Sequence, residues 1–157
     1  MGRTMAYLAG AGSAAILLGA WGFQYIGGLA PCPICIWQRW PHAVAAILAM
    51  LLLALPKPLH GLTMALGAVA AAVTGAIGVY HTGIERGWWQ GPDSCTGSGD
   101  ALGGLTGTDL LDFNAPVTLV MCDDVAWSMF GLSMASWNAL ASFAFAALWI
   151  MALRQRA

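Results

Sequence analysis

The sequence predicts an all-α membrane protein in which four transmembrane helices form one bundle. Three observations predict this class: 59% of the 157 residues are hydrophobic, only 8% are charged, and four long stretches carry no charge at all. A soluble domain carries about 25% charged residues, because water must cover its surface. Each uncharged stretch approaches or exceeds the roughly 20 residues that cross a bilayer as a helix. We therefore expect residues 1–157 to form a single integral membrane domain.

The four expected spans lie near residues 7–26, 37–55, 59–81 and 134–153. Each must be helical, because unpaired backbone groups find no water in hydrocarbon. The first apolar stretch is longer than the roughly 7–15 residues of a signal-peptide core, so we expect it to stay as a span. Pro41 means that the second helix begins late or bends there. Pro56 and Pro58 close this span and predict a tight connection to the third.

The charged residues predict the orientation. All seven acidic residues lie between the third and fourth spans, from Glu85 to Asp124. Most basic residues lie at the two ends and between the second and third spans: Arg3, Lys57, Arg154 and Arg156. Since cytoplasmic loops are enriched in Lys and Arg, we place both termini in the cytoplasm. The two outer loops are then residues 27–36 and 84–133, although Arg39 and Arg86 are basic residues on that side.

The second outer loop is the only sizeable region outside the expected spans. It begins with the turn sequence Gly91-Pro92-Asp93-Ser94, and a Gly/Ser/Thr-rich stretch follows. Apolar patches then occur within residues 110–121. Such patches are typical of segments that lie on a membrane surface, and they could equally fold over the helix ends.

All four cysteines fall in these two outer loops, Cys32 and Cys35 in the first and Cys95 and Cys122 in the second. The outer side of a bacterial inner membrane, or a lumen, is where disulfides persist. Cys32 and Cys35 form a Cys-x-x-Cys motif, in which thiol pKa values are often lowered. Cys35 would lie near the first turn of the second span, where the helix N-terminus favours a thiolate. Arg39, one turn further on, adds a positive charge on the same face.

Other uses of the cysteines fit less well. A c-type haem site needs a histidine directly after the motif, and Ile36 stands there. A four-cysteine zinc site usually has two close pairs, whereas 26 residues separate Cys95 from Cys122. We therefore expect no metal site. Two inert disulfides that staple the loops stay an open alternative, more so for Cys95 and Cys122 than for the first pair.

Several motifs, taken in order, resemble the DsbB family of disulfide bond formation proteins. The segment from Cys32 to Arg39 is similar to the family's Cys-x-x-Cys-x-x-x-Arg signature. The ordered set is specific, although no single motif is decisive. The other matching motifs are Tyr80-His81-Thr82-Gly83-Ile84-Glu85, Gly91-Pro92-Asp93-Ser94-Cys95, Cys122-Asp123, Trp127, Gly131-Leu132-Ser133 and Trp137-Asn138.

The resemblance implies a thiol-disulfide oxidoreductase of the bacterial inner membrane, with its redox loops facing the periplasm. Such a protein oxidises a DsbA-like thioredoxin-fold partner and passes the electrons to a membrane quinone, either ubiquinone or menaquinone. By position, Cys95 would be the sulfur that the partner's thiolate attacks. Cys122 would be its disulfide mate and would pair transiently with Cys32.

The resemblance also implies a quinone site. Cys35 would face the quinone ring, and Arg39 would stabilise both the Cys35 thiolate and the developing quinone anion. His81 falls where the family has a histidine near the quinone. A thiol that reacts with a lipid-soluble oxidant must lie at the membrane edge, which is where the expected spans place Cys35.

Two other functions fit part of the pattern. A vitamin K epoxide reductase-like protein is also a four-helix membrane thiol enzyme, but its redox Cys-x-x-Cys follows the loop cysteines, whereas here the motif comes first. A non-catalytic membrane subunit with structural disulfides would keep all four cysteines oxidised and unreactive. A nucleic-acid partner is disfavoured, because the net charge is −1 and there is no basic patch.

Overall fold

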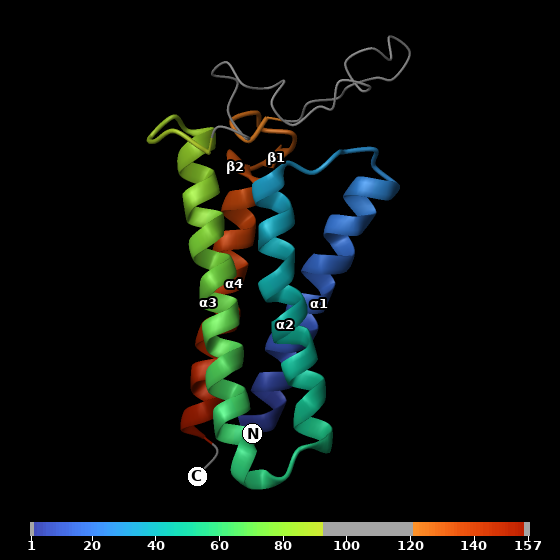
Figure 1. The fold of residues 1–157 in the computed structure, drawn as a ribbon, viewed down its shortest axis with the longest axis vertical. Coiled ribbons are helices and arrows are strands. Elements are labelled where there is room, and N and C mark those ends of the chain that lie inside the picture. The colour runs from blue at the N-terminus through green and yellow to red at the C-terminus, as the bar shows by residue number, and fades with distance from the viewer. Residues whose placement is uncertain (1, 93–120, 156–157) are drawn as a thin grey trace.

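The structure, a computed structural model, describes residues 2–92 and 121–155. Its four long helices run side by side as one bundle (Figure 1). By length and composition all four could cross a membrane, which confirms the predicted fold class. The helices are α1 (Gly2–Tyr25), α2 (Pro33–Ala54), α3 (His60–Glu85) and α4 (Met134–Arg154).

The connections alternate between the two ends of the bundle. The start of α1, the end of α4 and the short 3-10 helix η1 (Lys57–Leu59) lie at one end (Figure 1). Arg3 contacts α2 at this end, where its Nη2 donates a hydrogen bond of 3.3 Å to the carbonyl oxygen of Leu52. The connection from α1 to α2 and the end of α3 lie at the opposite end (Figure 1). Both cysteines of the Cys-x-x-Cys motif therefore lie at that second end.

Two helices begin at residues whose own side chains cap them. The Sγ atom of Cys32 accepts a hydrogen bond of 3.3 Å from the backbone N–H of Cys35 at the start of α2. Pro33 follows in the first turn, where a helix needs no N–H donor. Ser133 caps α4 in the same way, accepting a bond of 3.2 Å from the N–H of Ser136. The cap fixes the start of α2 at the motif itself.

The helices reach further towards the second end than the expected spans. α2 begins at Pro33 and not near residue 37, because the Cys32 cap and Pro33 together start it early. The helix passes through Pro41, so this proline neither delays its start nor ends it. α3 continues to Glu85 and not only to residue 81. Cys35 and Glu85 are therefore helical residues and do not lie in loops.

Small side chains dominate the bundle interior. Lipid is as apolar as leucine, so helices in a membrane associate through close packing more than through hydrophobic burial. Gly67 illustrates this, because a Cβ atom there would lie 2.6 Å from the ring of the fully buried Trp149. Large apolar side chains such as Leu53, which is 71% exposed, cover the outside instead. The main buried cluster comprises Ala6, Ala9, Ala49, Leu52, Met64, Ala71, Ala146, Trp149 and Ala152.

A short hairpin precedes α4 at the cysteine end of the bundle. Its strands are β1 (Ser128–Met129) and β2 (Leu132–Ser133), which pair antiparallel. Phe130 and Gly131 both have positive φ angles, 53° and 76°, as the central residues of a type I′ turn require. The indole N–H of Trp137 donates to the Met129 carbonyl at 3.1 Å, which ties the hairpin to α4. Cys95 and residues 110–120 of the predicted apolar patches lie outside the described residues.

Candidate functional site

The Cys-x-x-Cys motif lies at the N-terminus of α2, with its two sulfur atoms in contact. The Sγ atoms of Cys32 and Cys35 are 3.1 Å apart, and both residues are free thiols. Cys32 is buried and Cys35 is half-buried. One of the pair is thus shielded and the other is partly accessible, although only two residues separate them.

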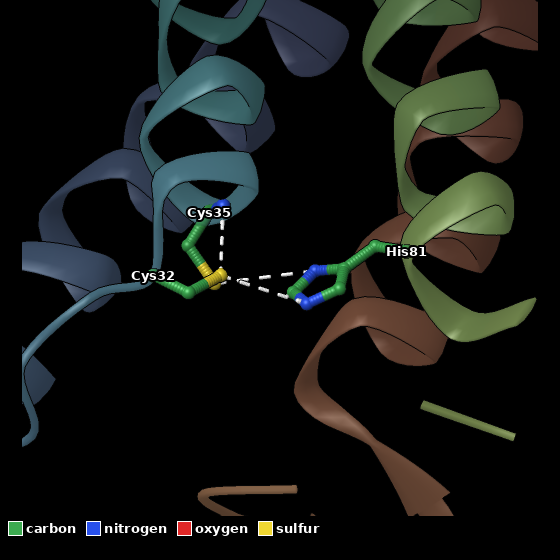
Figure 2. A group of neighbouring side chains, drawn as sticks. All are labelled: Cys32, Cys35 and His81. Atoms are coloured by element: carbon green, nitrogen blue, oxygen red, sulfur yellow. Dashed lines mark hydrogen bonds between the residues drawn. The ribbon is translucent and has the colours of Figure 1, made fainter. Parts of the chain in front are cut away.

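His81 on α3 faces both sulfur atoms (Figure 2). Its Nε2 lies 3.6 Å from Sγ of Cys32, and its Nδ1 lies 4.0 Å from Sγ of Cys35. Glu85, one turn further along α3, places a carboxyl oxygen 4.0 Å from Nε2 of His81. Ser133 in turn donates its hydroxyl to the Glu85 carboxyl group. The end of α3 therefore supplies an imidazole and a carboxyl group beside the dithiol.

The local electrostatics favour a thiolate at Cys32. A hydrogen bond from the Cys35 thiol, together with one from His81, holds the pKa of Cys32 well below that of an ordinary thiol, at about 4. Burial opposes this shift. The backbone N–H of Cys35 adds a smaller contribution. The sequence led us to expect the thiolate at Cys35, but the helix cap is Cys32, so the helix terminus acts on Cys32.

The lowered pKa of Cys32 predicts how the reduced protein reacts with iodoacetamide. In a Cys95→Ser/Cys122→Ser background, alkylation of Cys32 should stay fast from neutral pH down to about pH 5, because the thiolate is the reactive form. Mass spectrometry of the labelled peptides measures the rate. Cys35→Ala removes the hydrogen bond that is the largest cause of the lowered Cys32 pKa. It should therefore move the pH midpoint of Cys32 alkylation up towards that of an ordinary thiol, whereas Ile36→Ala should not. A Cys32 midpoint near that of a free thiol in the parent protein would contradict this assignment.

Arg39 lies further along α2 and makes a hydrogen bond to the first helix. Its Nη1 donates to Oε1 of Gln24 at 2.6 Å. Its Nε is buried and has no hydrogen-bond partner among the described residues. The sequence suggested Arg39 as a neighbour of the Cys35 thiolate. The structure places it on the wall of the same cavity as Cys35 and gives its guanidinium a polar partner on α1.

A cavity of about 110 Å³ joins these groups. Its volume is many times what one water molecule needs. Both thiols, Arg39 and His81 line it, and apolar side chains of α1 form part of the remaining wall. Arg39, Cys35 and His81, the three residues expected at a cofactor site, thus share one cavity. Its apolar lining from α1 is Ile16, Leu17 and Ala20.

Cys122 packs against the first cysteine pair. It is fully buried in a small cluster with Cys32, Ile34 and Ile84. It is disulfide-bonded, and its disulfide partner lies outside the described residues. A backbone group of Cys122 also forms a hydrogen bond with His81. Three of the four predicted redox cysteines therefore meet at one end of the bundle, and Cys95 is not among the described residues.

Several polar residues for which the sequence indicated no role line or support this site. Gln38, one turn after Cys35, is buried and reaches Nδ1 of His81 at 3.1 Å. Asn138 on α4 contacts Gln38. Polar side chains inside a membrane span are costly, and their presence in apolar segments was the signal that could have found them.

Comparisons with known proteins show the family of this chain. The family model described as "Disulfide bond formation protein DsbB" matches residues 2–152. A disulfide bond formation protein B of Verminephrobacter eiseniae is 30% identical over 140 residues, covering 85% of this chain and 75% of that protein. One from Stutzerimonas stutzeri is 29% identical, with 88% and 86% covered. One from Hahella chejuensis is 27% identical, with 98% and 94% covered.

No solved structure matches the chain significantly. The family match nevertheless spans all four helices and includes the cysteine motif, His81 and the α4 segment around Asn138. The chain is a multi-pass membrane protein, and it belongs to the DsbB family of disulfide bond formation proteins.

Proposed function

We propose that this protein is a membrane dithiol:quinone oxidoreductase that reoxidises a DsbA-like periplasmic partner with a thioredoxin fold. One observation carries the proposal beyond family membership. The free thiols of Cys32 and Cys35 share a largely apolar cavity with Arg39 and His81 at one end of a bundle of membrane-spanning helices. A dithiol placed there can exchange with protein disulfides on one side and meet a lipid-soluble oxidant on the other.

The exchange steps begin at the loop disulfide that we assign to Cys95 and Cys122. A thiolate of the reduced partner attacks Sγ of Cys95, which forms a mixed disulfide and releases the Cys122 thiolate. Cys122 then attacks Cys32 in the oxidised Cys32–Cys35 disulfide and releases the Cys35 thiolate. The burial of Cys122 against Cys32 supports this pairing, because the two residues already belong to one packed cluster.

The remaining exchange steps restore the disulfide between Cys95 and Cys122. The partner's second thiolate attacks the partner sulfur that is bonded to Cys95. The partner then leaves with an internal disulfide, and Cys95 is released as a thiolate. Cys95 attacks Cys122 and expels Cys32. The low pKa of Cys32 makes it a good leaving group, since thiols of low pKa leave faster. Two electrons and two protons have then moved from the partner to Cys32 and Cys35.

The cavity residues fit a quinone headgroup. Cys32 and Cys35 would give up two electrons and two protons to a bound quinone and return to the disulfide, since a quinone would supply the two-electron oxidation. We assign Cys35 to the quinone side because it is the less buried of the two thiols. Arg39 has a buried Nε without a described partner, which a quinone oxygen would satisfy. His81 would line the same site.

The sidedness follows from the same assignment. Disulfide exchange needs an oxidising compartment, so the cysteine end of the bundle would face the periplasm and both termini the cytoplasm. The basic residues at the opposite end support this orientation, because Arg3 and Lys57 lie there with the end of α4. The protein would then belong to a bacterial inner membrane.

Trapping experiments test the exchange steps. A thioredoxin-fold partner that lacks its second cysteine should form a mixed disulfide with Cys95 of this protein, and Cys95→Ser should capture none. The double variant Cys35→Ser/Cys95→Ser should form the Cys32–Cys122 disulfide, seen by non-reducing peptide mapping. A non-catalytic subunit with structural disulfides predicts neither product. Absence of the mixed disulfide, or capture of the partner at Cys32, would overturn the proposed order.

A further inference from the structure

A chain of buried and half-buried polar side chains runs from His81 into the interior of the bundle. Nε2 of Gln38 lies 3.1 Å from Nδ1 of His81, and Oε1 of Gln38 lies 2.5 Å from Nδ2 of Asn138. Oδ1 of Asn138 lies 2.7 Å from Nε2 of His42. These hydrogen bonds thus link α3, α2 and α4, beginning at Gln38, one helical turn after Cys35. Buried polar groups between membrane helices are costly unless each is paired, so their hydrogen bonds must be mutually consistent.

Thr74 determines which way the Asn138 amide points. Its hydroxyl donates to the backbone carbonyl of Gln38 at 3.1 Å, which uses its only proton. Its oxygen can then only accept from Asn138, whose amide nitrogen lies 3.4 Å away. The hydroxyl of Ser142, one turn further along α4, donates to Oδ1 of Asn138 at 3.4 Å. The Thr74 hydroxyl therefore holds the amide of Asn138 in one orientation, and the Ser142 hydroxyl is compatible with that orientation.

Gln38 is oriented by its neighbours as well. Its Oε1 accepts from Asn138, and its Nε2 lies 3.4 Å from the carbonyl oxygen of Ile34. The reversed amide would set the Gln38 oxygen against the Ile34 carbonyl and the Asn138 oxygen against Thr74. Both are contacts between two acceptors. The Nε2 group of Gln38 must therefore donate to Nδ1 of His81.

We propose that Asn138, acting through Gln38, holds His81 in the tautomer that carries its proton on Nε2, the nitrogen that faces Cys32. Nδ1 is occupied as an acceptor, so the ring proton belongs on Nε2. Nε2 lies 3.6 Å from Sγ of Cys32 and 4.0 Å from a Glu85 oxygen, and both atoms can accept a hydrogen bond from it. Asn138 and Gln38 are positioning residues, since they act on the sulfur through His81.

The tautomer matters for the step in which Cys32 leaves as a thiolate. An N–H group aimed at the sulfur stabilises the negative charge, whereas the other tautomer would turn a lone pair towards it. This consequence for turnover rests on the proposed function. The tautomer itself is a property of the reduced protein and can be measured without a quinone or a partner.

The groups that face Cys32 come from every element around it. Cys35 and Arg39 belong to α2, and His81 and Glu85 belong to α3; all four line the cavity with Cys32. Asp124, in the segment before β1, lines it too. The described residues of α1 and α4 that line this cavity carry no titratable group. A change at Asn138 or Gln38 therefore alters the surroundings of Cys32 without changing their charge.

The experiment compares Asn138→Leu and Gln38→Met with the parent protein, reduced and in detergent. Nitrogen NMR on protein with ¹⁵N-labelled histidine identifies which ring nitrogen of His81 is protonated, and a His81→Gln spectrum assigns its signals. The alkylation rate of Cys32, in the Cys95→Ser/Cys122→Ser background, is the second readout. Thr63→Val is the matched control, because Thr63 is also a buried threonine of α3 but bonds to the Leu59 carbonyl of the preceding turn.

The parent and Thr63→Val should show the proton on Nε2 alone. Asn138→Leu and Gln38→Met should each show a mixture of tautomers, and the pH profile of the Cys32 alkylation rate should shift up by about one pH unit, as loss of one hydrogen bond implies. A proton on Nδ1 in the parent, alone or with one on Nε2, would overturn the proposal. Unchanged spectra and rates in both folded variants would do the same. A change in Gln38→Met without one in Asn138→Leu would mean that Asn138 does not position His81.

Discussion

Replacing Cys32 with serine is expected to lower turnover with a reduced thioredoxin-fold partner by about a thousandfold or more, since cysteines that act as one relay cannot replace one another. Cys32 is the sulfur that touches Cys35 at 3.1 Å and packs with Cys122, so in the proposed mechanism it would join the two redox pairs. Without it, electrons that reach Cys122 have no acceptor. Oxidation of the partner, followed by non-reducing electrophoresis, measures the loss.

A matched variant shows that such a loss is not structural. Ser13 is fully buried in α1, away from the cavity lining, and Ser13→Ala removes a buried hydroxyl without touching the dithiol. We expect Ser13→Ala to keep parental turnover. Cys32→Ser with more than a small fraction of parental turnover, at equal protein level, would mean that electrons bypass Cys32.

Arg39→Met is expected to impair the reaction with quinone while leaving protein exchange intact. The guanidinium lines the cavity. Its buried Nε has no hydrogen-bond partner among the described residues, and a ligand oxygen would supply one. Loss of one charged hydrogen bond corresponds to about a 10- to 100-fold fall in kcat/KM for the quinone. Quinone absorbance measures this half of the reaction, and formation of the Cys32–Cys122 disulfide measures the other half.

Gln24→Leu is the control for this variant, because Gln24 accepts the 2.6 Å bond from Arg39 but does not line the cavity. It should weaken quinone use less than Arg39→Met does. Equal losses in both half-reactions of Arg39→Met would indicate a damaged helix end and would contradict a role at the quinone.

Much of the fold could be predicted from hydropathy alone, because the membrane leaves helices as the simplest way to pair the backbone. The precise start of α2 could not. It depends on Cys32 acting as a cap through its sulfur, with Pro33 in the first turn, and these two residues move Cys35 onto the helix. That detail also bears on the chemistry, since the backbone N–H at the cap adds to the lowering of the Cys32 pKa, whose largest cause is the hydrogen bond from the Cys35 thiol.

The site was predictable only where residues lie close in the sequence or where a family motif names them. Cys32 and Cys35 are close in sequence, and His81 came from the resemblance. The contact between Gln38 and Asn138 joins residues that are 100 positions apart on different helices, so no local pattern predicts it. The hydrogen-bond directions that orient His81 follow from this packing, and they appear only when α2, α3 and α4 are placed together.

The most direct test of the proposed function is an anaerobic electron count. Purified protein loaded with quinone is mixed with limiting reduced thioredoxin-fold partner, and quinone absorbance and partner disulfide are measured in the same sample. We predict that one quinol forms for each partner disulfide and that Cys95→Ser yields neither product. Oxidation of the partner without loss of quinone absorbance, or quinone reduction that persists in Cys95→Ser, would contradict the account.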